Sequence, residues 1–100
     1  MIKHIVMWKL PEEKDGLKKS EIAMKIKKSL ETLPALIDEI VNLQVGVNFN
    51  ESDMAYDVCL VTDFKTKEDL DAYQKNEEHL KVATYIRSVN EGRCVADYEY

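Results

Sequence analysis

Apolar residues along residues 2–9 fall on both sides of the chain when it is taken as extended. One side holds Ile2, His4, Val6 and Trp8, and the other holds Lys3, Ile5, Met7 and Lys9. Because strand side chains alternate between two faces, the stretch is predicted to be a strand. A strand with one wet face would be apolar on one side only. We therefore place it in the middle of a sheet, with something covering each face.

Three further stretches predict a helix and two strands in the first two thirds of the chain. Residues from about Gly16 to Leu33 are apolar at helical spacing, and Pro34 ends this predicted helix. The alternation from about Glu39 to Val47 leaves one side polar, which predicts an edge strand. The stretch from about Tyr56 to Phe64 is partly apolar on both sides and predicts a second central strand.

The last third predicts a helical region and a final strand. Thr66 and Asp69 resemble a capping box that opens a helix, which Asn76 interrupts before helical residues continue to about Arg87. The final strand runs from about Arg93 to Tyr100. The order strand, helix, strand, strand, helix, strand is the ferredoxin-like β-α-β-β-α-β pattern of an α+β protein with a four-stranded antiparallel sheet.

The usual strand order of this pattern, 4-1-3-2, puts the first and third strands in the centre, in agreement with their two apolar sides. Both helices then cover the same face of the sheet. The other face, bearing Ile5, Met7, Cys59 and Val61, is predicted to be an exposed apolar patch in a monomer. We therefore predict a homodimer packed sheet against sheet.

Composition narrows the class of protein. One hundred residues, 45% hydrophobic and 33% charged, predict a single globular domain over residues 1–100. The formal net charge of -5 argues against a nucleic-acid partner. No apolar run approaches the roughly 20 residues of a membrane span, and charged residues break up the N-terminal stretch, so neither a membrane partner nor a secretory signal is expected. Cys59 and Cys94 lack CxxC spacing and are interpreted as core residues of a cytoplasmic protein.

Four short stretches carry a recognisable pattern. They are Lys3-His4-Ile5-Val6, Tyr56-Asp57-Val58, Ala72-Tyr73 through Glu78-His79-Leu80, and Val95-Ala96-Asp97-Tyr98. In this order they resemble the stress-responsive A/B barrel (Dabb) domain family, and the resemblance covers nearly the whole chain. It implies a ferredoxin-like homodimer of the dimeric α/β barrel type, as the two-sided strands also indicate.

The resemblance also implies candidate site residues. The family includes plant olivetolic acid cyclase, which closes a linear polyketide by an intramolecular aldol step without a metal or organic cofactor. The resemblance to this enzyme implies catalytic roles for His4, Tyr73 and His79. It implies an apolar ligand pocket formed by Val6, Trp8, Leu60, Thr62 and Val82. Many members carry His-Pro where this chain has Asn76-Glu77, so the approach to His79 departs from the family pattern.

The three candidate catalytic residues suit an aldol closure, which needs a base and donors to a developing oxyanion. A histidine of pKa near 6.5 is a suitable base, and a tyrosine hydroxyl is a suitable donor. The hypothesis is that His79 is the base while Tyr73 and His4 polarise the substrate oxygen. The structural alternatives are a core histidine at His4, a half-exposed helix residue at His79 and a packed aromatic at Tyr73.

Asp97 is a further candidate. If the first and last strands pair antiparallel, His4 and Asp97 become near neighbours on one face of the sheet. A carboxylate there could fix the tautomer and orientation of the imidazole, or could simply make a structural hydrogen bond.

Three functions compete at this point. The first is a cofactor-free enzyme, lyase- or cyclase-like or oxygenase-like, acting on a small apolar carbonyl or polyketide-like compound. The second is a non-catalytic, stress-responsive binding or structural dimer. The third is haem binding through a helix histidine, ranked last because the second helix has no tryptophan. No His-x-x-x-His spacing indicates a metal site, and no cofactor is expected.

Overall fold

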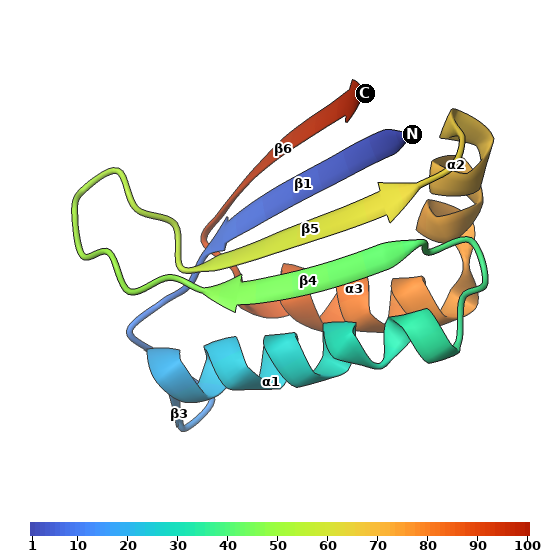
Figure 1. Ribbon diagram of the computed structural model, residues 1–100. Helices are drawn as coiled ribbons and strands as arrows, with labels where there is room; N and C mark the ends of the chain where they lie inside the picture. Colours follow the sequence, from blue (N-terminus) through green and yellow to red (C-terminus); the bar gives the residue numbers. More distant parts are fainter.

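Four antiparallel strands with helices on one face make up the computed structural model, which describes residues 1–100 (Figure 1). The elements are β1 Ile2–Lys9, β2 Glu13–Lys14, β3 Leu17–Lys18, α1 Lys19–Glu31, the 3-10 turn η1 Leu33–Ala35, β4 Asn42–Val47, β5 Val58–Phe64, α2 Lys67–Lys75, α3 Glu77–Val89 and β6 Gly92–Glu99. This confirms the ferredoxin-like α+β fold. None of the helices has the length and apolar character that crossing a membrane requires.

The strand order is β4-β5-β1-β6, so both strands predicted to be central are central. Ile5 of β1 lies opposite Val61 of β5 on one side and Ala96 of β6 on the other. The register also places His4 opposite Asp97, which confirms that these two residues are neighbours. The predicted edge strand, β4, is at the edge of the sheet.

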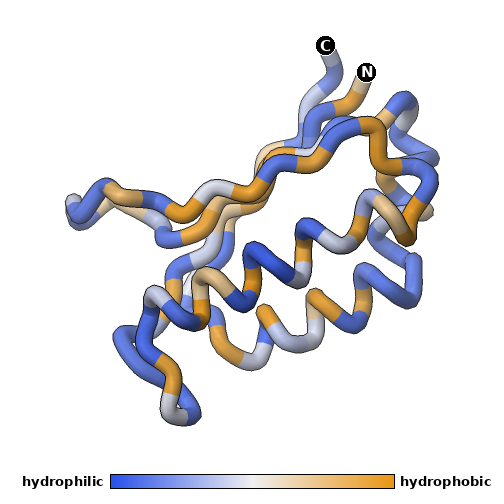
Figure 2. The backbone as a smooth tube through the Cα atoms, turned by 60° about the horizontal axis from the view of Figure 1, so that its bottom comes forward, coloured by the Kyte–Doolittle hydropathy of each residue, from blue (hydrophilic) through white to orange (hydrophobic).

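The hydrophobic core lies between the sheet and the helices. Val6 and Trp8 of β1 are 2% and 6% exposed, and Ile22 and Ile26 of α1 are fully buried. Hydrophobic and hydrophilic positions are interspersed along the strands and the helices (Figure 2). The buried apolar residues of both kinds of element form one core cluster.

The opposite face of the sheet has no helix over it (Figure 1). Ile5, Met7 and Val61 lie there, and each is partly exposed. Cys59 and Cys94 lie on the same face, one on each side of Met7, and both are free and partly exposed. The interpretation of the two cysteines as core residues is therefore wrong, because the period-two alternation directs them away from the helices.

The first helix begins three residues later than the sequence predicted. Asp15 and Gly16 have φ angles of 53° and 83° and form the two-residue turn of a small hairpin between β2 and β3. Positive φ at both central residues is the geometry that tight hairpins favour, and Asp-Gly adopts it readily. Gly16 therefore belongs to a turn, and α1 starts at Lys19.

Other predicted boundaries differ by one to three residues. β4 begins at Asn42 rather than Glu39, and β5 begins at Val58 rather than Tyr56. The helix that restarts after Asn76 continues to Val89, two residues beyond Arg87. These differences lie at element ends, where hydrogen bonding rather than hydrophobic pattern sets the limit.

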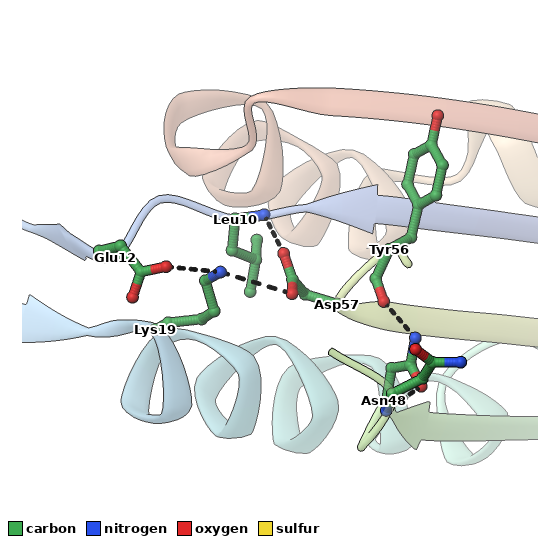
Figure 3. Close-up of polar contacts among 7 residues, drawn as sticks. Leu10, Glu12, Lys19, Asn48, Tyr56 and Asp57 are labelled. Atoms are coloured by element: carbon green, nitrogen blue, oxygen red, sulfur yellow. Dashed lines mark hydrogen bonds and ion pairs between the residues drawn. The ribbon is translucent and has the colours of Figure 1, made fainter. Parts of the chain in front are cut away.

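Asp57 joins three segments at one end of the sheet (Figure 3). Its carboxylate accepts a hydrogen bond from the Leu10 backbone N–H at 2.7 Å and lies 3.6 Å from Lys19 Nζ. Lys19 Nζ also lies 3.0 Å from Glu12 Oε1. The Asp57 backbone N–H donates to the Trp8 carbonyl at 2.8 Å. These contacts tie the end of β1 to the start of α1 and to the β4–β5 loop.

The same loop is closed at its base by Asn48 (Figure 3). The Asn48 side-chain amide donates to the Tyr56 carbonyl at 2.6 Å, and the Asn48 backbone N–H donates to the Asp57 carbonyl at 2.9 Å. The residues between them form the long excursion that extends past the sheet in Figure 1.

Candidate active site

A cavity of about 160 Å³ lies between the helix-covered face of the sheet and helices α2 and α3. His4, Tyr73 and His79 all line it, so the structure brings the three candidate catalytic residues together. The other lining residues are Val6, Trp8, Leu30, Leu60, Gln74, Ala83, Ile86, Arg87, Asn90 and Arg93. A cavity of about 150 Å³ is large enough to hold a benzene ring.

Three of the predicted pocket residues lie beside this cavity rather than in its lining. Thr62 is fully buried, and its hydroxyl donates to the His4 carbonyl at 3.2 Å. Val82 packs against the core from α3. Asp97 lies on β6 and contacts His4. Their roles in ligand binding stay predictions, whereas Val6, Trp8 and Leu60 do line the cavity.

His4 is held from two sides. Its ring is buried, and its Nδ1 shares a hydrogen bond with Asp97 Oδ1 across the β1–β6 ladder. A carboxylate accepts hydrogen bonds and has none to give, so Nδ1 carries the proton in this contact. Nε2 has no hydrogen-bond partner in the protein. Asp97 thus fixes the tautomer and the orientation of the His4 ring and leaves Nε2 unpaired.

Tyr73 is the centre of an aromatic cluster on α2. Its side chain is fully buried, with its ring centroid 5.0 Å from Phe64, 4.4 Å from His79 and 6.2 Å from His4. Its hydroxyl is buried without a hydrogen-bond partner. Burial raises the pKa of Tyr73 well above its usual value, so the hydroxyl keeps its proton and can act only as a neutral donor or acceptor.

The chain places His79 in the first turn of α3. Asn76 caps this helix, because its side chain accepts a hydrogen bond from the Glu78 backbone N–H at 2.9 Å. The carboxylates of Glu77 and Glu78 lie in the first turn of α3, where the positive end of the helix dipole stabilises them. The Asn-Glu pair found here instead of His-Pro therefore builds a regular helix start that fixes His79 on the cavity side.

His79 is a half-buried base. Its Nδ1 lies 3.2 Å from the Gln74 carbonyl, which can only accept, so Nδ1 carries the proton and Nε2 is left unpaired. Burial lowers the pKa of His79, although the hydrogen bond to Gln74 offsets part of this effect. Electrostatic repulsion from His4, and then from Arg93 and Arg87, lowers the pKa further. At neutral pH the imidazole is uncharged and able to accept a proton.

Sequence reasoning missed four polar residues of the cavity lining, namely Gln74, Arg87, Asn90 and Arg93. A signal for two of them was available, because Arg87 and Arg93 are the only arginines among 14 basic residues. Their approach to one cavity depends on how α3 packs beside β6, which the local pattern does not reveal.

Solved structures with the same fold cover nearly the whole chain. A dimeric ferredoxin-like protein of unknown function from Bacteroides fragilis is 29% identical, with a TM-score of 0.87 over 99% of this chain and 95% of that one. A protein of Arabidopsis thaliana is 22% identical, with a TM-score of 0.81 over 100% and 95%. A hydroxynitrile lyase from Passiflora edulis is 16% identical, with a TM-score of 0.79 over 97% and 90%. No curated protein matches the chain.

The family comparison agrees with the four motifs in the sequence. The model of the Stress responsive A/B Barrel Domain matches residues 2–100. Within that span lie the paired strands β1 and β6, which join His4 to Asp97, and the helices that carry Tyr73 and His79. The chain therefore belongs to the stress-responsive A/B barrel domain family.

Proposed function

We propose that this protein is a cofactor-independent acid–base catalyst for a small carbonyl compound bound between the sheet and the helices. The observation that carries the proposal is the hydroxyl of Tyr73, which is buried without a partner beside two histidines. An unpaired buried hydroxyl costs about 1–3 kcal/mol of stability. A ligand oxygen in the cavity would supply the missing partner and recover this cost.

The geometry supports the following chemistry. His79 Nε2 takes a proton from the carbon next to the carbonyl, and the electron pair of that C–H bond moves toward the carbonyl oxygen. The Tyr73 hydroxyl donates a hydrogen bond to this oxygen as its negative charge grows. His4, held by Asp97, faces the same cavity and adds polarisation. The enolate carbon then forms a bond to a second carbonyl carbon, and the resulting alkoxide takes the proton back from His79, as in an aldol step.

The size of the cavity limits the substrate. Typical ligand pockets measure about 300–1,000 Å³, whereas this cavity measures about 160 Å³. It accommodates a compound of one ring rather than an extended polyketide, and a haem group does not fit within it. The alternative function is a binding module that holds a compound of the same size without turnover.

Deuterium exchange separates the two functions. Acetophenone, phenylacetone, phenylpyruvate and acetoacetate are each incubated with the protein in D₂O, and loss of the α-proton signal is followed by NMR. The proposal expects protein-dependent exchange that falls about 100-fold or more in His79→Gln, the scale of general base catalysis. Tyr73→Phe should lower the rate at least about tenfold, since one donor to the developing charge is lost.

Tyr85→Phe is the matched control, because Tyr85 also has a buried hydroxyl without a partner but does not line the cavity. Its exchange rate should equal that of the wild type. Binding without protein-dependent exchange would establish the module function instead. Exchange that survives His79→Gln unchanged would remove His79 from the role of base.

We also propose that two copies associate through the open face of the sheet. Ile5, Met7 and Val61 form an apolar surface there that no helix covers. The similar protein from Bacteroides fragilis is dimeric. Burial of these side chains against a second copy would remove their apolar surface from water. Sedimentation equilibrium should give twice the chain mass of 11.6 kDa, and a monomer mass at all concentrations would contradict this.

A further inference from the structure

The cavity that holds the two histidines also holds both arginines of the chain. Arg87 on α3 and Arg93 on β6 line it, and both side chains are exposed, so they lie at its mouth. Two elements separated by the turn after α3 therefore direct their only arginines to one place. Twelve lysines are spread over the rest of the chain.

Neither arginine has an acidic partner. No carboxylate oxygen lies within 4.0 Å of either guanidinium, although the chain carries 19 acidic residues and a net charge of -5. Five of the twelve lysines are paired with carboxylates, namely Lys3, Lys19, Lys27, Lys75 and Lys81. In an acidic chain, two unpaired arginines at the mouth of one cavity are available to an external anion.

The cavity lining is suited to an anion as well. It contains no aspartate or glutamate, and apart from the two arginines, the two histidines and Tyr73 its polar side chains are the neutral amides of Gln74 and Asn90. The field of both arginines reaches the interior, since both lower the pKa of His79. The carboxylate of Asp97 contacts His4 without lining the cavity.

We infer that the site takes a small molecule with an anionic head group, which Arg87 and Arg93 hold at the mouth while a ring-sized apolar body occupies the cavity. The inference rests on the proposed function, because it names the substrate class of the same site. Guanidinium groups bind carboxylates and phosphates through two parallel hydrogen bonds. The apolar body contacts Val6, Trp8 and Leu60, and a carbonyl between head group and body can reach Tyr73.

Matched probes test the charge requirement. Benzoate and benzamide have nearly the same shape and differ in charge, and phenyl phosphate carries the other anionic head group. Their dissociation constants are measured by NMR titration and calorimetry with the wild type, Arg87→Gln, Arg93→Gln and the double variant. Benzoate or phenyl phosphate should bind at least about tenfold more tightly than benzamide, and the tighter of the two identifies the head group.

The double variant should lose this preference of about tenfold for the anion while its affinity for benzamide changes less than twofold. Higher salt should reduce the preference in the wild type, because exposed charges are screened. Lys81→Gln is the matched control, since it removes one positive charge from α3 outside the cavity lining, and it should leave all three affinities within twofold.

Three results would overturn the inference: equal affinity for benzoate and benzamide, an unchanged anion preference in the double variant, or no binding of either anion at 10 mM probe. These outcomes are distinct from failure of the proposed function. Arginine-dependent binding of an anion without proton exchange supports the ligand class and refutes the catalyst. If neutral acetophenone exchanges its α-protons at a rate that neither arginine variant changes, the catalyst is supported and the anionic ligand class is refuted.

Discussion

The two faces of the sheet are built from the same strands and differ in almost everything else. On the helix-covered face, Val6 is 2% exposed, and His4 is buried with its Nδ1 paired. On the open face, Ile5 and Met7 are partly exposed, and no helix lies over them. The polar groups suited to chemistry lie on the first face, and the apolar surface suited to association lies on the second.

This difference gives the two proposed tasks, catalysis and association, separate surfaces of one short chain. Period-two alternation assigns neighbouring residues of β1 to opposite sides of the sheet. One side can then be closed around a cavity, while the other is left to a partner. A substitution at one position should therefore affect one task and spare the other.

The largest effect is expected from placing a charge on each face in turn. Val6→Asp puts an unpaired carboxylate into the core and should cost more than about 4 kcal/mol, enough to unfold a small domain. Ile5→Asp should leave the monomer folded and abolish association. Circular dichroism and sedimentation measure the two outcomes. If both variants unfolded, or if both remained dimeric, the two faces would not differ in this way.

Removing the unpaired hydroxyls should raise stability. Tyr73→Phe and Tyr85→Phe each delete a buried hydroxyl without a partner and should stabilise the fold by about 1 kcal/mol. Only Tyr73→Phe should also slow α-proton exchange, because only Tyr73 lines the cavity. Urea denaturation measures the first effect. A loss of stability in Tyr73→Phe would mean that its hydroxyl is satisfied in solution.

Asp97→Asn should weaken the anchor of His4. The hydrogen bond is charge-assisted, but the Asp97 side chain is 42% exposed, so the expected loss of unfolding free energy is only about 1 kcal/mol. Ligand affinity should fall as the imidazole loses its fixed orientation. Glu99→Gln, on the same strand without such a partner, is the control. Unchanged stability together with unchanged affinity would remove both the structural and the functional role of Asp97.

The smallest effect concerns pH. The pKa of His79 in the folded state is lower than its unfolded value of about 6.5. As pH falls below about 6.5, the unfolded state takes up a proton before the folded state does, so stability falls. Relative to His79→Gln, the wild type should therefore lose stability between about pH 7 and pH 5. Denaturation midpoints at four pH values across this range measure the difference, and parallel curves would contradict it.

The apolar residues on both sides of residues 2–9 were sufficient to predict that β1 is central. The antiparallel pairing expected of the first and last strands was sufficient to predict that His4 lies beside Asp97. The pattern failed at Gly16, where Asp15 supplies a strong hairpin signal but the flanking strands are only two residues long. With so few residues, the hairpin shows no alternation to distinguish it from a helix start.

The candidate site was predicted less completely. Tyr73 and His79 came from a resemblance, not from periodicity, since the aromatic and polar spacing of α2 and α3 does not by itself mark a cavity. Thr62 was expected in the pocket from the same resemblance, and in the structure its hydroxyl donates to the His4 carbonyl. Arg87 and Arg93 belong to different elements, and only tertiary packing brings them together.

The closed base of the β4–β5 loop has a practical consequence for engineering. Asn48 and Asp57 fasten the two ends of the loop to each other and to β1, so residues 49–55 are joined to the fold through a preformed stem. None of residues 49–55 lines the cavity. Doubling the length of a flexible loop costs only about 0.6 kcal/mol. A fluorescent or affinity peptide can thus be grafted into this excursion, giving a labelled protein in which the lining of the cavity is left intact.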